Sequence, residues 1–143
     1  FSSRRRHTRC REVSWVGDVY KRQGDMVLRT LSRVISQYTD DTIHAGRYGG
    51  EEFLILFSGY TRKQAGKILE GMLTNFRNQE YDFLPEDVII TFSAGFTYLD
   101  NKNIDVEGFI KCADEALYYS KEHGRNQITY YNDLRLRDMQ VNR

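Results

Sequence analysis

The sequence is poor in several residues whose abundance marks particular classes of protein. Its 143 residues include one proline and two cysteines, Cys10 and Cys112, which form neither a metal-binding spacing nor a disulfide framework. A reducing, cytoplasmic environment is therefore the simplest expectation. No apolar run approaches the ~20 residues of a membrane-spanning helix. With 40% hydrophobic and 29% charged residues, the composition excludes a disordered or fibrous chain and indicates one globular domain.

Positive charge is concentrated at the beginning of the chain. Residues 1–23 carry seven basic and two acidic side chains, a balance of +5, whereas residues 24–143 carry 14 basic and 18 acidic ones, a balance of −4. A basic head is typical of a nucleic-acid arm, a membrane arm or a targeting peptide. This head has no apolar segment, which argues against a secretory signal.

A different origin explains the head better. Residues 3–9 back-translate to AGC AGA AGA CGG CAT ACG AGA, and residues 17–23 to GGA GAT GTG TAT AAG AGA CAG. Both strings resemble oligonucleotide adapters for DNA library preparation, the second a transposon end, and they occur in the right order. We therefore expect residues 1–23 to be a non-native segment, with the true gene beginning further upstream, and we expect no nucleic-acid partner.

The body alternates between helix and strand patterns, which predicts a mixed α/β sheet covered by helices. Helices are expected over residues 26–38, 61–76 and 106–120, because apolar residues recur there at helical spacing. A capping box, Thr61–Gln64, opens the second of them. Strands are expected over residues 43–48, 52–57, 90–98 and 127–131. The polar residues 132–143 are expected to form a fraying tail or the start of a lost segment.

The stretch RYGGEEF, residues 47–53, places two glycines beside two adjacent carboxylates. A two-residue link of Gly49 and Gly50 suits a tight hairpin, in which glycines adopt positive φ and allow a ligand to approach. Phosphate oxygens could then meet backbone N–H groups, and Glu51 and Glu52 could bind a nucleotide-borne Mg²⁺. A solvated hairpin tip with charged flanks is the alternative, and this stretch alone does not decide between them.

A second pattern ends the helix expected over residues 106–120. Lys121 and Arg125 lie one turn apart, and Gly124 stands where a glycine often terminates a helix. The two cations could simply complement the helix dipole. They could equally reach triphosphate oxygens, arginine as a fork and lysine as a point charge.

Four segments of the body together resemble the GGDEF-domain diguanylate cyclases. RYGGEEF resembles the signature hairpin in its Glu variant, and Gly24-Asp25-x-x-Leu28 is similar to the end of GHxxGDxxL. FSAG at residues 92–95 is similar to a strand ending S-x-G, and ADEALYYSKEHGRN at residues 113–126 is similar to ADxALYxAKxxGRN. The resemblance covers about residues 24–131, in the same order and at the same spacing.

This resemblance implies an α/β (α+β) fold, with a palm or ferredoxin-like nucleotide-cyclase sheet flanked by helices and its first strand missing. The GGDEF domain would span residues 24–132, and residues 133–143 would be the polar tail. Such domains condense two GTP molecules into cyclic di-GMP plus pyrophosphate, for bacterial second-messenger signalling. The implied partners are GTP, Mg²⁺ (or Mn²⁺), a second GGDEF domain in a catalytic homodimer, and a fused sensory domain in the parent. The domain would lie in the cytoplasm, even where the parent is anchored in a membrane.

The resemblance also assigns roles at the hairpin. Glu51 would ligate the metal and help to activate the attacking 3′-hydroxyl, and Glu52 would support the metal site. Gly49 and Gly50 would place backbone N–H groups against the phosphates. Arg47 would brace the hairpin.

The remaining roles concern the nucleotide. Asp25 would accept hydrogen bonds from the guanine edge, and Leu28 would pack on the base. Lys121 and Arg125 would hold the β- and γ-phosphates. A regulatory GGDEF module that binds GTP without condensing it is the alternative function.

Three departures from the family pattern bear on activity and regulation. Counting back from Asp25, the metal-binding Asp of the first strand falls at Thr8 and a guanine-binding Asn at Val16, and neither residue suits its role. We therefore expect the chain as given to be inactive. The flanking strands should lack a ladder partner unless the strand-like residues 13–16 fill the place. The Arg-x-x-Asp product-binding site reads Asp40-Asp41-Thr42-Ile43, without its arginine.

Overall fold

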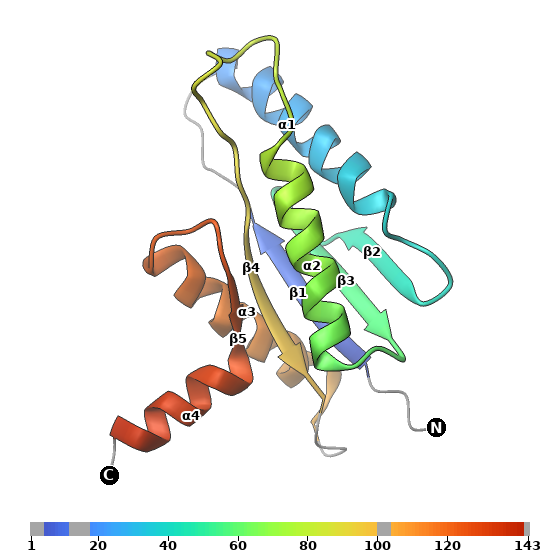
Figure 1. The fold of residues 1–143 in the computed structure, drawn as a ribbon, viewed down its shortest axis with the longest axis vertical. Coiled ribbons are helices and arrows are strands. Elements are labelled where there is room, and N and C mark those ends of the chain that lie inside the picture. The colour runs from blue at the N-terminus through green and yellow to red at the C-terminus, as the bar shows by residue number, and fades with distance from the viewer. Residues whose placement is uncertain (1–4, 12–17, 100–103, 142–143) are drawn as a thin grey trace.

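A computed structural model describes residues 5–11, 18–99 and 104–141, with side chains from residue 22 onward (Figure 1). Its middle layer is a five-stranded sheet in the order β2-β3-β1-β4-β5. Only β4 and β5 pair in parallel. The elements in chain order are β1 (Arg5–Arg11), α1 (Asp18–Ser36), β2 (Ile43–Arg47), β3 (Glu52–Ser58), α2 (Arg62–Arg77), β4 (Ser93–Tyr98), α3 (Val106–Glu122), β5 (Ile128–Tyr130) and α4 (Tyr131–Val141).

The centre of the sheet is filled by a segment that the sequence analysis set aside. β1 pairs antiparallel with β3 on one side and with β4 on the other, so that Arg11 stands opposite both Glu52 and Ser93. The expected gap at the first strand is therefore closed by Arg5–Arg11. Residues 13–16 lie outside the described part of the chain. A strand ladder uses backbone groups, so β3 and β4 accept a partner whose side chains differ from those of the family.

One face of the sheet carries α1 and α2. The capping box of α2 forms as predicted, with Thr61 N–H donating to Gln64 Oε1 (2.9 Å) and Gln64 N–H donating to Thr61 Oγ1 (3.2 Å). Buried side chains of α1, α2, β3 and β4, together with Phe92 just before β4, make one apolar cluster between these helices and the sheet. Its members include Leu31, Val34, Ile55, Phe57, Leu69, Phe76, Phe92 and Phe96. This cluster fixes α1 against the sheet. It therefore also positions the α1 residues that line the cleft beside β2.

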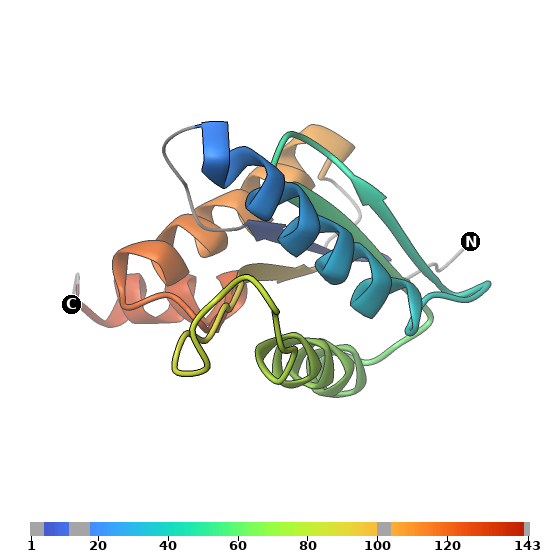
Figure 2. The same cartoon turned by 90° about the horizontal axis from the view of Figure 1, so that it is seen from above.

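The opposite face is covered by α3, and Figure 2 shows α2 and α3 on either side of the sheet. Five of the six residues of β4 are buried, because this strand is covered on both faces. Gly95 explains the close packing, because a Cβ added there would lie 2.1 Å from the carbonyl oxygen of Ala113 and 2.2 Å from Leu117 N. The backbone of α3 therefore rests directly on β4.

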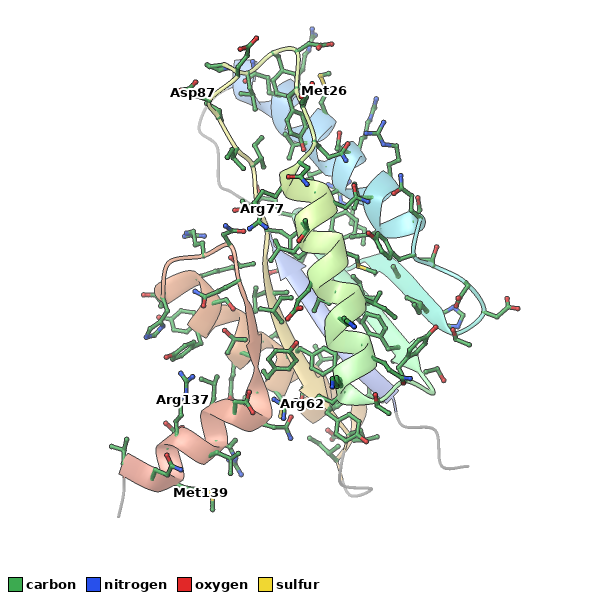
Figure 3. The ribbon with its side chains drawn as sticks, in the orientation of Figure 1. Met26, Arg62, Arg77, Asp87, Arg137 and Met139 are labelled. Atoms are coloured by element: carbon green, nitrogen blue, oxygen red, sulfur yellow. The ribbon has the colours of Figure 1, made fainter. Side chains whose placement is uncertain are left out.

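The largest differences from the predicted elements concern α1, β4 and the end of the chain. α1 begins at Asp18, eight residues earlier than expected, and runs without a break through residues 23 and 24. β4 begins at Ser93 rather than at residue 90. The expected tail instead forms α4, whose Asp133 accepts a 2.6 Å ion-pair contact from Arg62. Figure 3 labels Arg62 at the start of α2. No described helix is long and apolar enough to cross a membrane.

Candidate functional site

Several chain segments meet at one end of the sheet. The register places the end of β1 at Arg11 beside the start of β3 at Glu52 and the start of β4 at Ser93. β5 starts beside Ala94, and α3 ends over the same place because Ser120 Oγ donates to Ala94 O (2.9 Å). The hairpin and the end of α3 therefore share one edge, with two strand spacings, about 10 Å, between Glu52 and Ser93.

The hairpin turn is longer than the sequence predicted. Tyr48 N–H donates to Glu52 O (2.7 Å), which makes these two residues a pair and leaves Gly49, Gly50 and Glu51 as a three-residue connection. The left-handed region is occupied by Gly59 and Gly124 but not by Gly49 or Gly50. The expectation of a two-residue link with glycines at positive φ is wrong, because Glu51 belongs to the turn rather than to its flank.

Arg47 closes the turn from inside the hairpin. Its Nε donates to the carbonyl oxygens of Gly49 (3.3 Å) and Gly50 (3.2 Å), and its Nη2 also donates to Gly50 O. A trans peptide is planar, so its N–H points away from its own C=O. The N–H groups of Gly50 and Glu51 therefore face away from Arg47, whereas Gly49 N–H turns toward Glu52 O (3.3 Å). The N–H groups that point out of the turn thus belong to Gly50 and Glu51, whereas the resemblance assigned those of Gly49 and Gly50 to the phosphates.

The two carboxylates are half-buried and lie beside the turn. A Cβ added to Gly49 would lie 3.4 Å from Glu52 Oε2, so the Glu52 side chain folds back over the first glycine. Two adjacent carboxylates offer part of a Mg²⁺ ligand set. The remaining ligands would have to come from a neighbouring element, and β1 is the strand paired with β3 at Glu52.

The strand beside these carboxylates supplies no acid. β1 reads RRHTRCR, and Thr8, which takes the place of the metal-binding Asp, is paired with Ile55 and Phe96 inside the ladder. Within residues 5–11, 18–99 and 104–141, no group of three or more His, Cys, Asp or Glu side chains could hold a metal ion. The donors in the part of the chain that the structure describes therefore do not fit the metal site that the resemblance implies.

A cleft of about 520 Å³ lies between α1 and β2. Asp25 and Leu28, the two residues assigned to the guanine, both line it, and Arg29 follows Asp25 one helical turn later. Leu28 is 8% exposed and forms part of the apolar floor with Phe53, whereas Asp25 is exposed at the rim. The cleft combines an apolar surface for a flat ring with an acceptor for its edge. Arg29 was not singled out from the sequence.

The phosphate-binding candidates lie at the end of α3 but do not share a helix. Lys121 belongs to the last turn, whereas Arg125 follows the helix in the left-handed region, with φ 61°. Gly124, at φ 103°, occupies the terminating position that the sequence predicted. The expected helical spacing of the two cations is therefore wrong, and the turn after α3 decides where Arg125 points.

Asp40 has a structural role at the place of the product-binding motif. Its carboxylate accepts hydrogen bonds from Thr42 N–H (2.7 Å), Ile43 N–H (2.9 Å) and Thr42 Oγ1 (2.6 Å). The hydrogen bonds from Thr42 and then that from Ile43 hold the pKa of Asp40 below its ordinary value. These contacts fix the turn that leads into β2.

The comparisons with known proteins agree with this arrangement. The family model described as "Diguanylate cyclase, GGDEF domain" matches residues 21–127. Diguanylate cyclase A of Treponema denticola is 30% identical over 109 residues, which cover 74% of this chain and 29% of that protein. The chain spans about a third of the length of the curated relatives it matches.

Two solved structures share the fold. The GGDEF domain of DgcB from Caulobacter crescentus, in complex with c-di-GMP, has a TM-score of 0.78 and 25% identity, covering 91% of this chain and 79% of that one. The active GGEEF domain of a diguanylate cyclase from Vibrio cholerae has a TM-score of 0.75 and 26% identity, covering 90% and 83%. The nucleotide-cyclase fold class is thereby confirmed. The chain belongs to the GGDEF-domain diguanylate cyclase family, whose homologous members are nucleotidyltransferases.

Proposed function

We propose that this chain binds GTP along the shared end of the sheet and represents part of a diguanylate cyclase. The observation that carries the proposal is the common edge formed by the α1–β2 cleft, the Gly50–Glu51 turn and the end of α3. The guanine would lie in the cleft against Leu28, with its donor edge toward Asp25. The phosphates would extend toward Lys121 and Arg125.

In the parent protein, two such domains would face each other as a homodimer, with a sensory domain fused to each. The 3′-hydroxyl of one GTP attacks the α-phosphorus of the other and pyrophosphate leaves, twice, to close cyclic di-GMP. A third carboxylate from a native first strand would complete the metal site with Glu51 and Glu52. Because β1 of this chain contains no acid, the chain as given binds GTP but does not condense it.

The same observation favours a second candidate, a GGDEF module that binds GTP and regulates a fused partner without catalysis. The two candidates differ in what a restored first strand does. A restored strand creates turnover if the protein is a cyclase. If the protein is a regulatory module, GTP binding remains and no product forms. The intact pair Glu51 and Glu52 beside the turn favours the cyclase, because a binding module has no need of both.

The test is GTP binding and product formation by the purified 143-residue chain. Calorimetry should detect GTP binding in preference to ATP, and chromatography should detect no cyclic di-GMP after incubation with GTP and Mg²⁺. Asp25→Asn should weaken GTP binding about tenfold by removing a charge-assisted acceptor. Asp82→Asn, in the loop between α2 and β4, is the matched control. A lack of GTP binding would refute the nucleotide assignment, and turnover at the rate of intact cyclases would refute the inactivity.

A further inference from the structure

The turn that follows α3 is held in an uncommon backbone conformation. Gly124, Arg125 and Asn126 have φ values of 103°, 61° and 47°, three consecutive residues in the left-handed region. Glycine adopts such values freely, but an arginine there is uncommon. Such a conformation persists only where surrounding contacts hold it, and it fixes the direction in which the Arg125 side chain leaves the chain.

Gln127 supplies contacts that hold this turn. Its side-chain Nε2 donates to Ser120 O (3.1 Å) and to His123 O, two of the last carbonyl groups of α3. Ser120 O also accepts from Arg125 N–H (2.9 Å). The backbone carbonyl of Gln127 accepts from Ala94 N–H (2.9 Å), which ties the same residue to the start of β4. Gln127 therefore connects both ends of the turn to the sheet.

Ser120 secures the helix side of the turn. Its side chain is fully buried, and Oγ donates to Ala94 O (2.9 Å) while lying 2.6 Å from Thr129 Oγ1 on β5. The family pattern quoted above has alanine at this position, so the hydroxyl pair is a feature of this chain. Lys121 is the next residue of α3, so the contacts that fix Ser120 also fix the backbone of Lys121. The cations at residues 121 and 125 are thus attached to one polar network.

We propose that Gln127 is a positioning residue for the binding of nucleotide phosphates, acting with Ser120 through Lys121 and Arg125. The inference rests on the proposed GTP site and deepens it. Two cations hold one polyphosphate together only when their separation suits it, and here that separation is set by a turn rather than by a helix. Without the Gln127 donor, His123 O loses this hydrogen bond and Ser120 O keeps only the one from Arg125 N–H, so the turn is free to relax from its left-handed conformation.

The experiment compares GTP with guanosine, which lacks phosphates, as calorimetric ligands of the full chain. Gln127→Met keeps the length of the side chain and removes its donor. It should reduce the ratio of GTP affinity to guanosine affinity about tenfold, the loss of one charge-assisted contact, while guanosine affinity stays unchanged. Gln64→Met is the matched control, because Gln64 also caps a helix through its side chain but at the start of α2. It should lower the melting temperature and leave the ratio unchanged.

Ser120→Ala provides a second variant in case Gln127→Met does not fold, since the family pattern carries alanine at that position. It removes the buried hydroxyl contacts and should lower the same ratio by a smaller factor. The positioning role would be overturned if both folded variants kept the affinity ratio of the unmodified chain. If only Ser120→Ala folds, an unchanged ratio in that variant has the same meaning. In either case the proposed GTP site would remain. If the unmodified chain binds guanosine but shows no gain from the phosphates, both the phosphate site and the positioning role fail.

Discussion

The central strand β1 and the hairpin beside it contribute different things to the same sheet. β1 is paired along its whole length with β3 and from Arg6 to Arg11 with β4, yet its sequence RRHTRCR has none of the acids that the proposed chemistry needs. The hairpin carries Glu51 and Glu52, and β1 is the strand that pairs with it at this end of the sheet. A ladder selects for backbone hydrogen bonding, whereas a phosphoryl-transfer site selects for particular side chains, so one can be satisfied without the other.

The largest effect on activity is expected from replacing β1 with a strand that carries the missing metal-binding and guanine-binding side chains. Residues 1–23 are replaced with a family-typical first strand and turn that supply the Asp and the Asn. Cyclic di-GMP formation should then rise by roughly 10³-fold or more above that of the given chain, because a third carboxylate completes the metal site. Chromatographic product analysis measures the rate. A restored chain that binds GTP but stays inactive would favour the regulatory module instead.

The hairpin is tested in that restored protein by Glu51→Gln, which keeps the size of the side chain and removes its charge. The rate should fall by roughly 10³-fold, because an amide is a much weaker ligand for a hard cation. Circular dichroism should be unchanged, since the turn is not part of the apolar cluster. Glu86→Gln, in the loop before β4, is the control. Near-parental turnover of the Glu51 variant would make the hairpin an ordinary turn.

Gly95 on β4, the other neighbour of β1, and Gly50 in the hairpin should respond differently to an added methyl group. Gly95→Ala places a Cβ within 2.1 Å of the α3 backbone and should destabilise the fold by about 1–3 kcal/mol or more. Gly50→Ala meets nothing within 4 Å and lacks a left-handed φ, so its effect on stability should stay within about 0.5 kcal/mol. Urea unfolding of both variants measures the difference. Equal losses would mean that the turn is more constrained than its geometry indicates.

The smallest effect concerns Asp40, where a motif position serves the fold alone. Its pKa is lower in the folded state than its ordinary value of 3.8, so its charged form stabilises the fold. This contribution is complete above the unfolded pKa and is lost as the pH falls through the folded one. The loss of stability in Asp40→Ala should therefore be clear at pH 7 and vanish at the lowest pH that the fold tolerates. Asp41→Ala, which leaves the Asp40 hydrogen bonds in place, is the control, and a pH-independent difference would contradict the mechanism.

The sequence predicted the elements with strong local signals. The capping box of α2, both hairpin strands to within one residue, α3 and its terminating glycine all follow from periodicity and turn chemistry. These signals depend on residues close together in the sequence, so they can be recognised without knowing the tertiary contacts. The cleft that Asp25 and Leu28 share with Phe53 was not predicted, since no sequence pattern brings Asp25 to Phe53. The family resemblance named only Asp25 and Leu28, and their role at a guanine stays a prediction.

The remaining features depend on contacts that no local pattern encodes. Arg125 leaves the helix because Gln127 and Ser120 hold the turn. α4 has no buried residue and therefore no apolar periodicity, and its ion pair with Arg62 joins residues 71 positions apart. The filling of the central strand by residues 5–11 could not be predicted either, because backbone pairing carries almost no sequence signal.

The occupied centre of the sheet also determines how the protein behaves toward other copies of itself. An empty place there would leave two unpaired strand edges, on β3 and β4, facing each other across a slot that invites a foreign strand. With β1 in place, one long side of the sheet is β2, a five-residue edge with exposed residues and the charged Arg47 at its end. Short, charged edges are poor templates for fibril growth. A strand without catalytic residues can thus still protect a protein from aggregation.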